Sequence, residues 1–182
     1  MSIVITGNPG VGKHTITRKI ANRLNLPILD INSIAKDSGL LEQNQDTNDV
    51  DTKKLGKVFE QKRSERNIIV GHLAPYVLDK NQIEIMIVLR RNPYELIAVY
   101  KDRKYTERKI KENAGSEILG IIAHDATKQF HEKVFQINVS KNTISETVEK
   151  TIRLIFGDEN NEIVDWLELV KKNNDLEKFF SD

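Results

Sequence analysis

Short apolar runs alternate along this chain with segments whose apolar residues recur every three to four positions. The first run, Ser2–Thr6, consists mostly of β-branched residues without polar interruption, which is typical of a strand covered on both faces in a parallel sheet. Similar runs recur at 28–31, 67–70, 83–89 and 134–139. The pattern predicts a parallel sheet of five strands.

The segments between these runs have the spacing of helices. Ile16, Ile20 and Leu24 fall four residues apart and form one face that can dock on a sheet. Thr143 and Glu146 stand three residues apart, in the capping-box pattern that begins a helix. Helices are expected from 15 to about 26, at 33–41 and 55–59, from 93, at about 110–130, at 143–156 and at about 158–172, with an exposed loop at 42–49.

Strands that alternate with helices predict an α/β fold, in which helices cover both faces of the parallel sheet as a three-layer sandwich. A length of 182 residues suits one domain, and neither a linker nor a repeat divides the chain. Ligands of such folds bind outside the carboxyl ends of the strands. Residues that follow the predicted strands are therefore the candidates for function.

Composition and charge narrow the class of protein. The chain has no cysteine, which excludes disulfides and Cys-based zinc sites. It has no apolar run near 18 residues and no signal-like start, so we expect a cytoplasmic protein that does not enter a membrane. Residues 157–182 carry eight acids and three bases, net −5, which leaves residues 1–156 at +6 from a total of +1. A positive body suits phosphorylated partners.

The strongest chemical signal is the sequence GNPGVGKHT at residues 7–15, between the first strand and the first helix. Strand, glycine-rich turn and helix are the context of a phosphate-binding loop. Glycines let consecutive backbone N–H groups turn toward an anion, and the helix that follows adds its unpaired N–H groups. We expect Gly10, Gly12 and Lys13 to hold the β-phosphate. Lys13 is also expected to bridge β and γ oxygens, and Thr15 to reach an inner phosphate.

Two positions depart from the usual pattern of such loops. His14 stands where a hydroxyl residue commonly ligates Mg²⁺, and imidazole is a poor ligand for this ion, so we expect magnesium to be held through water. His14 can equally be an exposed residue that contributes only its backbone. The third strand ends in Val70 and Gly71, where a carboxylate is usual. Asp30, after the second strand, is either its substitute or a turn-capping residue.

Three further residues are candidates because of their position. His72 follows the third strand and is either functional or a structural turn residue. Arg103 lies in a basic segment, and a guanidinium can neutralise the charge that develops during phosphoryl transfer, although such segments are often solvated helix faces. Arg90 ends the fourth strand, where it is placed to contact a phosphate.

Four stretches together carry a more specific signature: GNPGVGKHT at 7–15, DINSIAKDSGL at 30–40, IIVGHLAPY at 68–76, and LRRNPYEL with DRKYTERKIKENAGSEILGIIAHDA between 89 and 126. In this combination the chain resembles an adenylate-kinase-related family that assists assembly of the small ribosomal subunit, the sixth adenylate kinase isoenzyme type. The family carries an acid and a histidine near the third strand. His72 matches the histidine, whereas Val70 takes the place of the acid.

The resemblance implies a P-loop fold of the nucleoside monophosphate kinase type, with a monophosphate-binding flap at about 30–52 and a short lid at about 102–112. Lys13, His72 and Arg103 are expected to act in catalysis, and Asp30 and Arg90 to contact the substrate. The expected ATP-binding positions are Gly7, Gly10, Val11, Gly12, Lys13, His14, Thr15 and Arg103.

The resemblance also implies an activity. The expected protein is a broad-specificity kinase that converts ATP and AMP into two ADP, with some ATP hydrolysis, and that acts in small-subunit maturation and pre-rRNA processing. ATP and water-held Mg²⁺ are the expected cofactors, with no metal ligand from the protein. The expected partners are AMP, a small-subunit ribosomal protein and pre-rRNA. The protein itself is expected to be a monomer. Two alternatives stay open: an assembly factor that binds nucleotide with little turnover, and a small-metabolite kinase of the shikimate-kinase kind.

Overall fold

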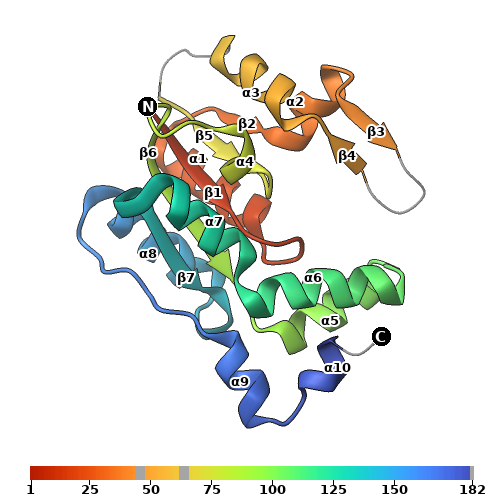
Figure 1. The fold of residues 1–182 in the computed structure, drawn as a ribbon. Helices are drawn as coiled ribbons and strands as arrows, with labels where there is room; N and C mark the ends of the chain where they lie inside the picture. The colour runs from red at the N-terminus through yellow and green to blue at the C-terminus, as the bar shows by residue number, and fades with distance from the viewer. Residues whose placement is uncertain (44–47, 62–65, 181–182) are drawn as a thin grey trace.

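A computed structural model describes residues 1–43, 48–61 and 66–180, with backbone alone at 41–43 and 48–49. Its centre is a parallel sheet of five strands in the order β2-β5-β1-β6-β7 (Figure 1). The strands are β1 (Ser2–Thr6), β2 (Ile28–Asp30), β5 (Ile68–Val70), β6 (Ile83–Arg90) and β7 (Val134–Asn138). The predicted α/β class and the five parallel strands are confirmed.

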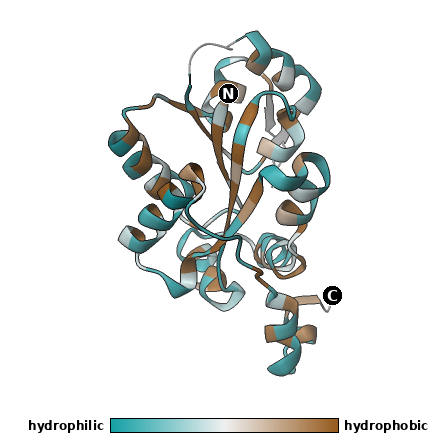
Figure 2. Ribbon diagram, turned by 90° about the vertical axis from the view of Figure 1, so that its left-hand side faces the viewer, coloured by the Kyte–Doolittle hydropathy of each residue, from teal (hydrophilic) through white to brown (hydrophobic). Residues whose placement is uncertain are grey.

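Helices cover both faces of the sheet because its strands are apolar on both sides. Val4 packs with α2 (Ile31–Asp37), α3 (Thr52–Gln61), α4 (Ala74–Val77) and α7 (Ile121–Phe130). Its neighbours Ile3 and Ile5 point the other way, toward α1 (Lys13–Leu24), α5 (Pro93–Asp102) and α8 (Ile144–Phe156). Figure 2 shows the brown, hydrophobic strands between helices whose outer sides are teal. The three-layer sandwich is therefore as predicted.

The expected long helix from residue 110 to 130 is two helices, so that prediction was wrong. Helix α6 (Glu107–Leu119) ends at Gly120, and α7 starts directly after it. Gly120 has a φ of 64°, a left-handed conformation that glycine adopts without strain. A Cβ at this position would lie 3.2 Å from the Arg90 guanidinium. The chain therefore changes direction where a side chain has little room.

The C-terminal helix begins later than expected. The predicted start near 158 was wrong, because Asp165 caps α9 (Trp166–Lys172), and a short α10 (Leu176–Phe180) follows. Residues 161 and 162 run beside the outer strand instead: the Asn161 side chain accepts from the Gln136 N–H at 2.7 Å. Helices α9 and α10 lie at the end of the molecule opposite α2 and α3 (Figure 1).

Several smaller features complete the fold. The stretch 42–49, expected as a loop, contributes to an antiparallel hairpin of β3 (Leu41–Gln43) and β4 (Asn48–Val50); its residues 44–47 lie outside the described part. The capping box of Thr143 and Glu146 is present, with both of its hydrogen bonds. Two 3₁₀ turns, η1 (His131–Lys133) and η2 (Val139–Lys141), flank β7. Within the described residues, the helices are too short or too polar to cross a membrane.

Candidate functional site

The glycine-rich loop between β1 and α1 has the backbone of an anion site. Gly7, Gly10 and Gly12 have φ values of 133°, 86° and 93°. A Cβ on Gly7 would lie 2.4 Å from the carbonyl oxygen of Leu89, so the loop passes directly against β6. Gly12 is the N-cap of α1 and offers no side-chain cap. The first amides of α1 are therefore left for a bound anion to satisfy.

Lys13 is folded back into this loop. Its ammonium group donates to the carbonyl oxygens of Gly7 at 2.8 Å and Asn8 at 2.9 Å. The side chain is 7% exposed. Burial is the main cause that lowers the pKa of Lys13 to about 8, and the charge of Arg103 lowers it further, against the opposing effect of two carboxylates. The amine is still mostly charged at pH 7, and a phosphate beside it would favour the charged form further.

An open cavity of about 640 Å³ lies beside the loop. Residues that follow β1, β2 and β5 contribute to it, as expected for the carboxyl edge of a parallel sheet. Residues of the predicted lid at about 102–112 contribute as well. Its lining residues are Asn8, Pro9, Gly10, Gly12, Lys13, His14, Thr15, Asn32, Val50, His72, Leu73, Tyr76, Arg103, Tyr105, Lys109, Asn113, Ser116, Ile121 and Ile122. Seven predicted positions meet here: Gly10, Gly12, Lys13, His14, Thr15, His72 and Arg103.

Four predicted residues are not part of this lining as the structure describes it. Gly7 and Val11 are buried residues of the loop itself, and Val11, 2% exposed, is part of the core. Asp30 stands behind His14. The structure places Arg90 away from the cavity: its side chain is 4% exposed and forms an ion pair with Glu117 at 2.8 Å. With its guanidinium engaged by protein groups, Arg90 has a structural position instead of the expected substrate contact.

Asp30 joins two neighbouring elements. One carboxylate oxygen accepts from the Ser33 N–H at 2.9 Å and caps α2, and the other lies 2.6 Å from His14 Nε2. Of the two interpretations that the sequence left open, the structure supports the capping role. His14 keeps 53% of its side chain exposed, at the cavity rim. Both oxygens of Asp30 therefore have protein partners.

His72 lies at the cavity in an uncharged state. Burial is the main cause that lowers its pKa to about 4, and the positive charge of Lys13 contributes, although Asp30 opposes it. Its ring is thus a neutral hydrogen-bonding group at physiological pH. Val70, at the position where an acid is usual, is fully buried at the end of β5. Its apolar side chain can neither hold a cation nor orient a nucleophile.

Aromatic residues connect the loop to the segment at about 102–112 that was predicted as a lid. Tyr100 of α5 donates its hydroxyl to the Pro9 carbonyl at 2.7 Å. Tyr105 stacks on Tyr100 with ring centroids 5.5 Å apart, and Lys109 lies 4.6 Å from the centre of the Tyr105 ring. Arg103, directly after α5, is exposed and lines the cavity. The segment therefore brings a guanidinium to the same cavity as the phosphate-binding loop.

A carboxylate that was not predicted as a site residue lies beneath the loop. Glu117 of α6 is fully buried and accepts from the side chains of Asn8 at 2.7 Å and Arg90 at 2.8 Å. A signal was present, because position 117 falls on the same helical face as the apolar residues Ile110 and Ala114. An acid on an apolar face needs buried partners, and this one supports the phosphate loop.

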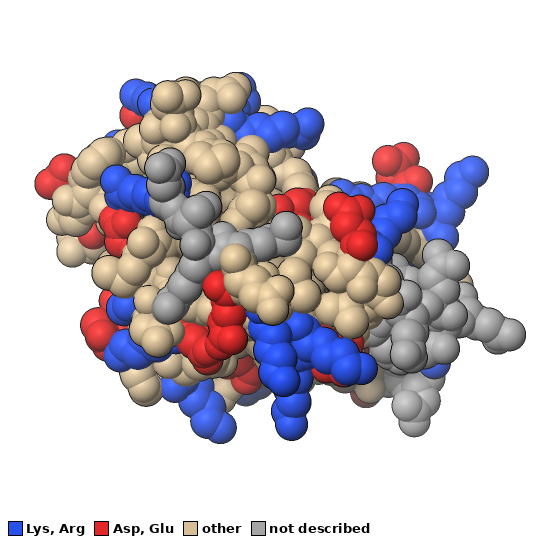
Figure 3. Space-filling view, turned by 90° about the horizontal axis from the view of Figure 1, so that it is seen from above, with Lys and Arg blue, Asp and Glu red and all other residues tan. Residues whose placement is uncertain are grey.

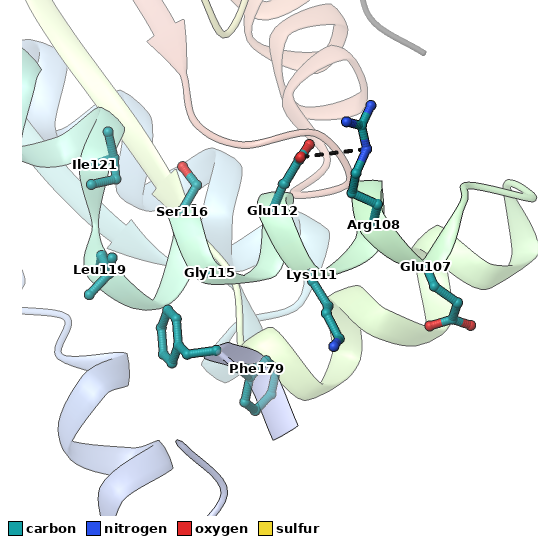
Figure 4. A pocket seen from close by; sticks show the side chains of 10 residues that line it. Glu107, Arg108, Lys111, Glu112, Gly115, Ser116, Leu119, Ile121 and Phe179 are labelled. Carbon is teal, nitrogen blue, oxygen red and sulfur yellow. Dashed lines mark ion pairs between the residues drawn. The ribbon is translucent and has the colours of Figure 1, made fainter. Parts of the chain in front are cut away.

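A second cavity, of about 720 Å³, lies between α6 and α10. Figure 4 shows Leu119 and Ile121 at one end of this cavity and Phe179 on its other side from α6. The ring of Phe180 lies against Gly115, where an added Cβ would be 3.3 Å from it. Ser116 and Ile121 line both cavities, so α6 separates them. Around the upper face of the molecule, basic and acidic side chains are interspersed, so neither sign covers it (Figure 3).

Comparisons with known proteins agree with this geometry. A family model described as “AAA domain” matches residues 3–120. The “Putative adenylate kinase” of Pyrococcus furiosus is 30% identical over 175 residues, which cover 94% of each chain. The protein of that name from Thermococcus kodakarensis is 30% identical over 172 residues, 93% of this chain and 94% of its own. A shikimate kinase from Acinetobacter baumannii shares the fold, with a TM-score of 0.58 and 17% identity over 86% of this chain and 93% of that one.

Proposed function

The chain belongs to the family whose model is described as “AAA domain”, and from that premise we propose that it is an ATP-dependent nucleoside monophosphate kinase that converts ATP and AMP into two ADP. The loop, Lys13 and Arg103 form the ATP side of the cavity. The other side lies between α2, α4 and α7, where Asn32, Tyr76 and Ile122 would receive the acceptor.

One observation carries the choice of acceptor: no Asp or Glu is among the described residues that line the cavity. A hydroxyl acceptor must lose a proton during transfer, and a nearby carboxylate commonly takes it. His72, whose pKa is about 4, is a weak base for this purpose. The phosphate of a nucleoside monophosphate is already an anion and needs no base. A cavity with cationic and neutral groups alone therefore favours AMP over a shikimate-like acceptor.

The transfer needs charge stabilisation and alignment. An oxygen of the AMP phosphate forms a bond to the γ-phosphorus, and the bond from that phosphorus to the β–γ bridging oxygen breaks, leaving ADP on both sides. Lys13 and Arg103 neutralise the charge on the transferred group, and neutral His72 donates or accepts one hydrogen bond. Mg²⁺ supplies further charge neutralisation when bound. Phosphates and water would hold this ion, and Thr15, which lines the cavity, would reach an inner phosphate.

The test is ADP formation from ATP with AMP, with shikimate, or with no acceptor. We expect AMP to raise the rate well above the acceptor-free rate, and Lys13→Ala to abolish it. Lys19→Ala is the matched control, because Lys19 is exposed on the same helix and lies outside the described lining. Equal rates with and without AMP would overturn the proposed acceptor. Shikimate-dependent ADP would establish the alternative kinase.

The same proposal includes work in small-subunit maturation, with a ribosomal protein and pre-rRNA as partners. Its support is the resemblance of the lid and of α6, where Arg103, Lys104 and Tyr105 precede the helix. Binding of purified small-subunit proteins, with and without ATP, tests this role separately from turnover. A partner whose affinity is the same with ATP, with ADP and without nucleotide would count against a nucleotide-driven assembly step.

A further inference from the structure

The C-terminal segment is attached to the helix that supports the phosphate loop. Trp166 and Val170 of α9 and Phe179 of α10 form a small apolar core with Ala114 and Ile118 of α6. Trp166 is 7% exposed and Val170 fully buried in this core. The segment is therefore fixed to α6 by apolar burial, well away from β1 in the sequence.

A second anchor holds the same segment to α5. The hydroxyl of Tyr94 donates to Asp175 at 2.7 Å and accepts from the Asn173 side chain at 3.1 Å. The Tyr94 ring meets Phe179 edge to face, with centroids 5.4 Å apart. None of these three contacts involves a residue of the phosphate loop, which makes the anchor a useful comparison for the contact described next.

Trp166 makes one polar contact that packing does not require. Its indole N–H donates to Glu117 Oε1 at 3.0 Å. The other oxygen of Glu117 accepts from the Asn8 side chain at 2.7 Å, and the Asn8 carbonyl accepts from Lys13 at 2.9 Å. An unbroken series of hydrogen bonds thus runs from α9 to the ammonium group of Lys13.

Each step of this series constrains the next. Glu117 is fully buried, and its Oε1 also accepts from Arg90 Nε at 2.8 Å and from the Arg91 N–H at 3.0 Å. Donors that converge on a buried carboxylate fix its rotamer, because rotation would leave a charged oxygen without partners. The position of Oε2 then sets where the amide of Asn8 lies, and Asn8 is part of the loop itself.

We propose that Trp166 is a positioning residue of the phosphate site, whose indole N–H acts through Glu117 and Asn8 on the loop and on Lys13. This inference rests on the proposed nucleotide binding and adds to it that α9 is a working part of the site. Residues 166–170 match no part of the family model, which ends at residue 120. The proposed ATP site therefore includes residues beyond those that the family model matches.

The test compares Trp166→Phe with Tyr94→Phe in the full chain. Both changes keep an aromatic ring and remove polar contacts of the C-terminal segment, one for Trp166 and two for Tyr94, but of these two residues only Trp166 contacts Glu117. We expect Trp166→Phe to weaken ATP binding about tenfold, as for the loss of one hydrogen bond to a charged group. Tyr94→Phe should change the ATP dissociation constant less than twofold, even if it lowers the melting temperature as much as Trp166→Phe does. Equal ATP dissociation constants in the two variants would overturn the inference.

A measurement on the unmodified protein covers the case in which Trp166→Phe does not fold. Trp166 is the chain's single tryptophan, so its indole N–H gives one signal in a nitrogen–proton NMR spectrum. Saturating ATP should shift this signal, and an unmoved signal would refute the coupling. Failure of the parent protein to bind ATP at all would instead refute the proposed function. A kinase that binds ATP while both readouts stay unchanged would lose this inference alone.

Discussion

The buried pair of Arg90 and Glu117 allows a quantitative prediction for the change Glu117→Gln. The two side chains are 4% and 0% exposed, and their closest atoms are 2.8 Å apart. Glutamine has nearly the same volume, so packing is retained. However, it removes the counter-charge of Arg90 and replaces one acceptor oxygen by an N–H group, which then faces donors such as the Asn8 amide or the Trp166 indole.

The size of the effect follows from what Arg90 keeps. Breaking a buried ion pair on one side typically costs about 3–5 kcal/mol. The guanidinium of Arg90 still donates to the Gln136 side chain at 2.7 Å and to the backbone oxygen of residue 117 at 2.8 Å. These retained bonds favour the lower limit, so we expect a loss of about 3 kcal/mol in unfolding free energy. For a domain of this size that corresponds to a melting temperature roughly 6–12 °C lower.

Urea and thermal unfolding measure this loss, and the chain offers a matched control. Arg91 and Glu95 form an exposed pair at 2.9 Å, with 31% and 41% of their side chains exposed. Because water screens such pairs, Glu95→Gln should cost less than about 1 kcal/mol. If Glu117→Gln destabilises the protein no more than Glu95→Gln does, then burial does not strengthen the pair in the way argued here.

Three further predictions concern the loop and the cavity beside it. ATP affinity should fall up to about tenfold per pH unit above pH 8, because phosphate needs the charged form of Lys13 and the free protein binds that proton with a pKa of about 8. Lys13→Arg, measured by calorimetry, should give an ATP affinity that does not change with pH over this range. The His72 ring should stay neutral down to about pH 4 in an NMR titration, and a midpoint near 6.5 would contradict the structure. The contribution of His72 to the unfolding free energy should decrease as the pH drops from 6.5 toward 4, because in this range only the unfolded chain binds the proton. Gly7→Ala should cost about 2–5 kcal/mol in urea unfolding, because its Cβ would lie 2.4 Å from the Leu89 carbonyl, whereas Gly12→Ala, with open space around it, should cost only about 1–3 kcal/mol of backbone strain.

The sheet and most helices could be predicted from the sequence because their signals are local. Runs of β-branched residues predict buried strands, and the spacing of Thr143 and Glu146 predicts a helix start. The predicted long helix failed at Gly120, where the apolar spacing continues but the backbone does not. Periodicity gives no sign of such a break. A glycine inside a regular pattern was the one available warning.

The candidate site divides in the same way. Lys13 and the loop glycines stand within nine consecutive residues, so their proximity is already a property of the sequence. Glu117 and Asn8 are 109 positions apart, and only the folded chain brings their side chains to 2.7 Å. Arg90 shows the opposite error: a strand-end position suggested a phosphate contact, but a buried acid from α6 engages it first. Position along a strand does not reveal which side chain arrives from elsewhere.

The shape of the loop depends on contacts made outside the glycine motif. The carbonyl of Pro9 accepts from the Tyr100 hydroxyl at 2.7 Å, and that of Gly10 accepts from Arg91 at 3.1 Å. In a trans peptide the C=O and the following N–H point in opposite directions. Holding these two carbonyls toward Tyr100 and Arg91 therefore turns the N–H groups of Gly10 and Val11 away from those side chains. Val11, whose side chain is buried in the core, can thus bind an anion through its backbone N–H, and the glycines permit a curvature that the side chains of Tyr100 and Arg91 impose.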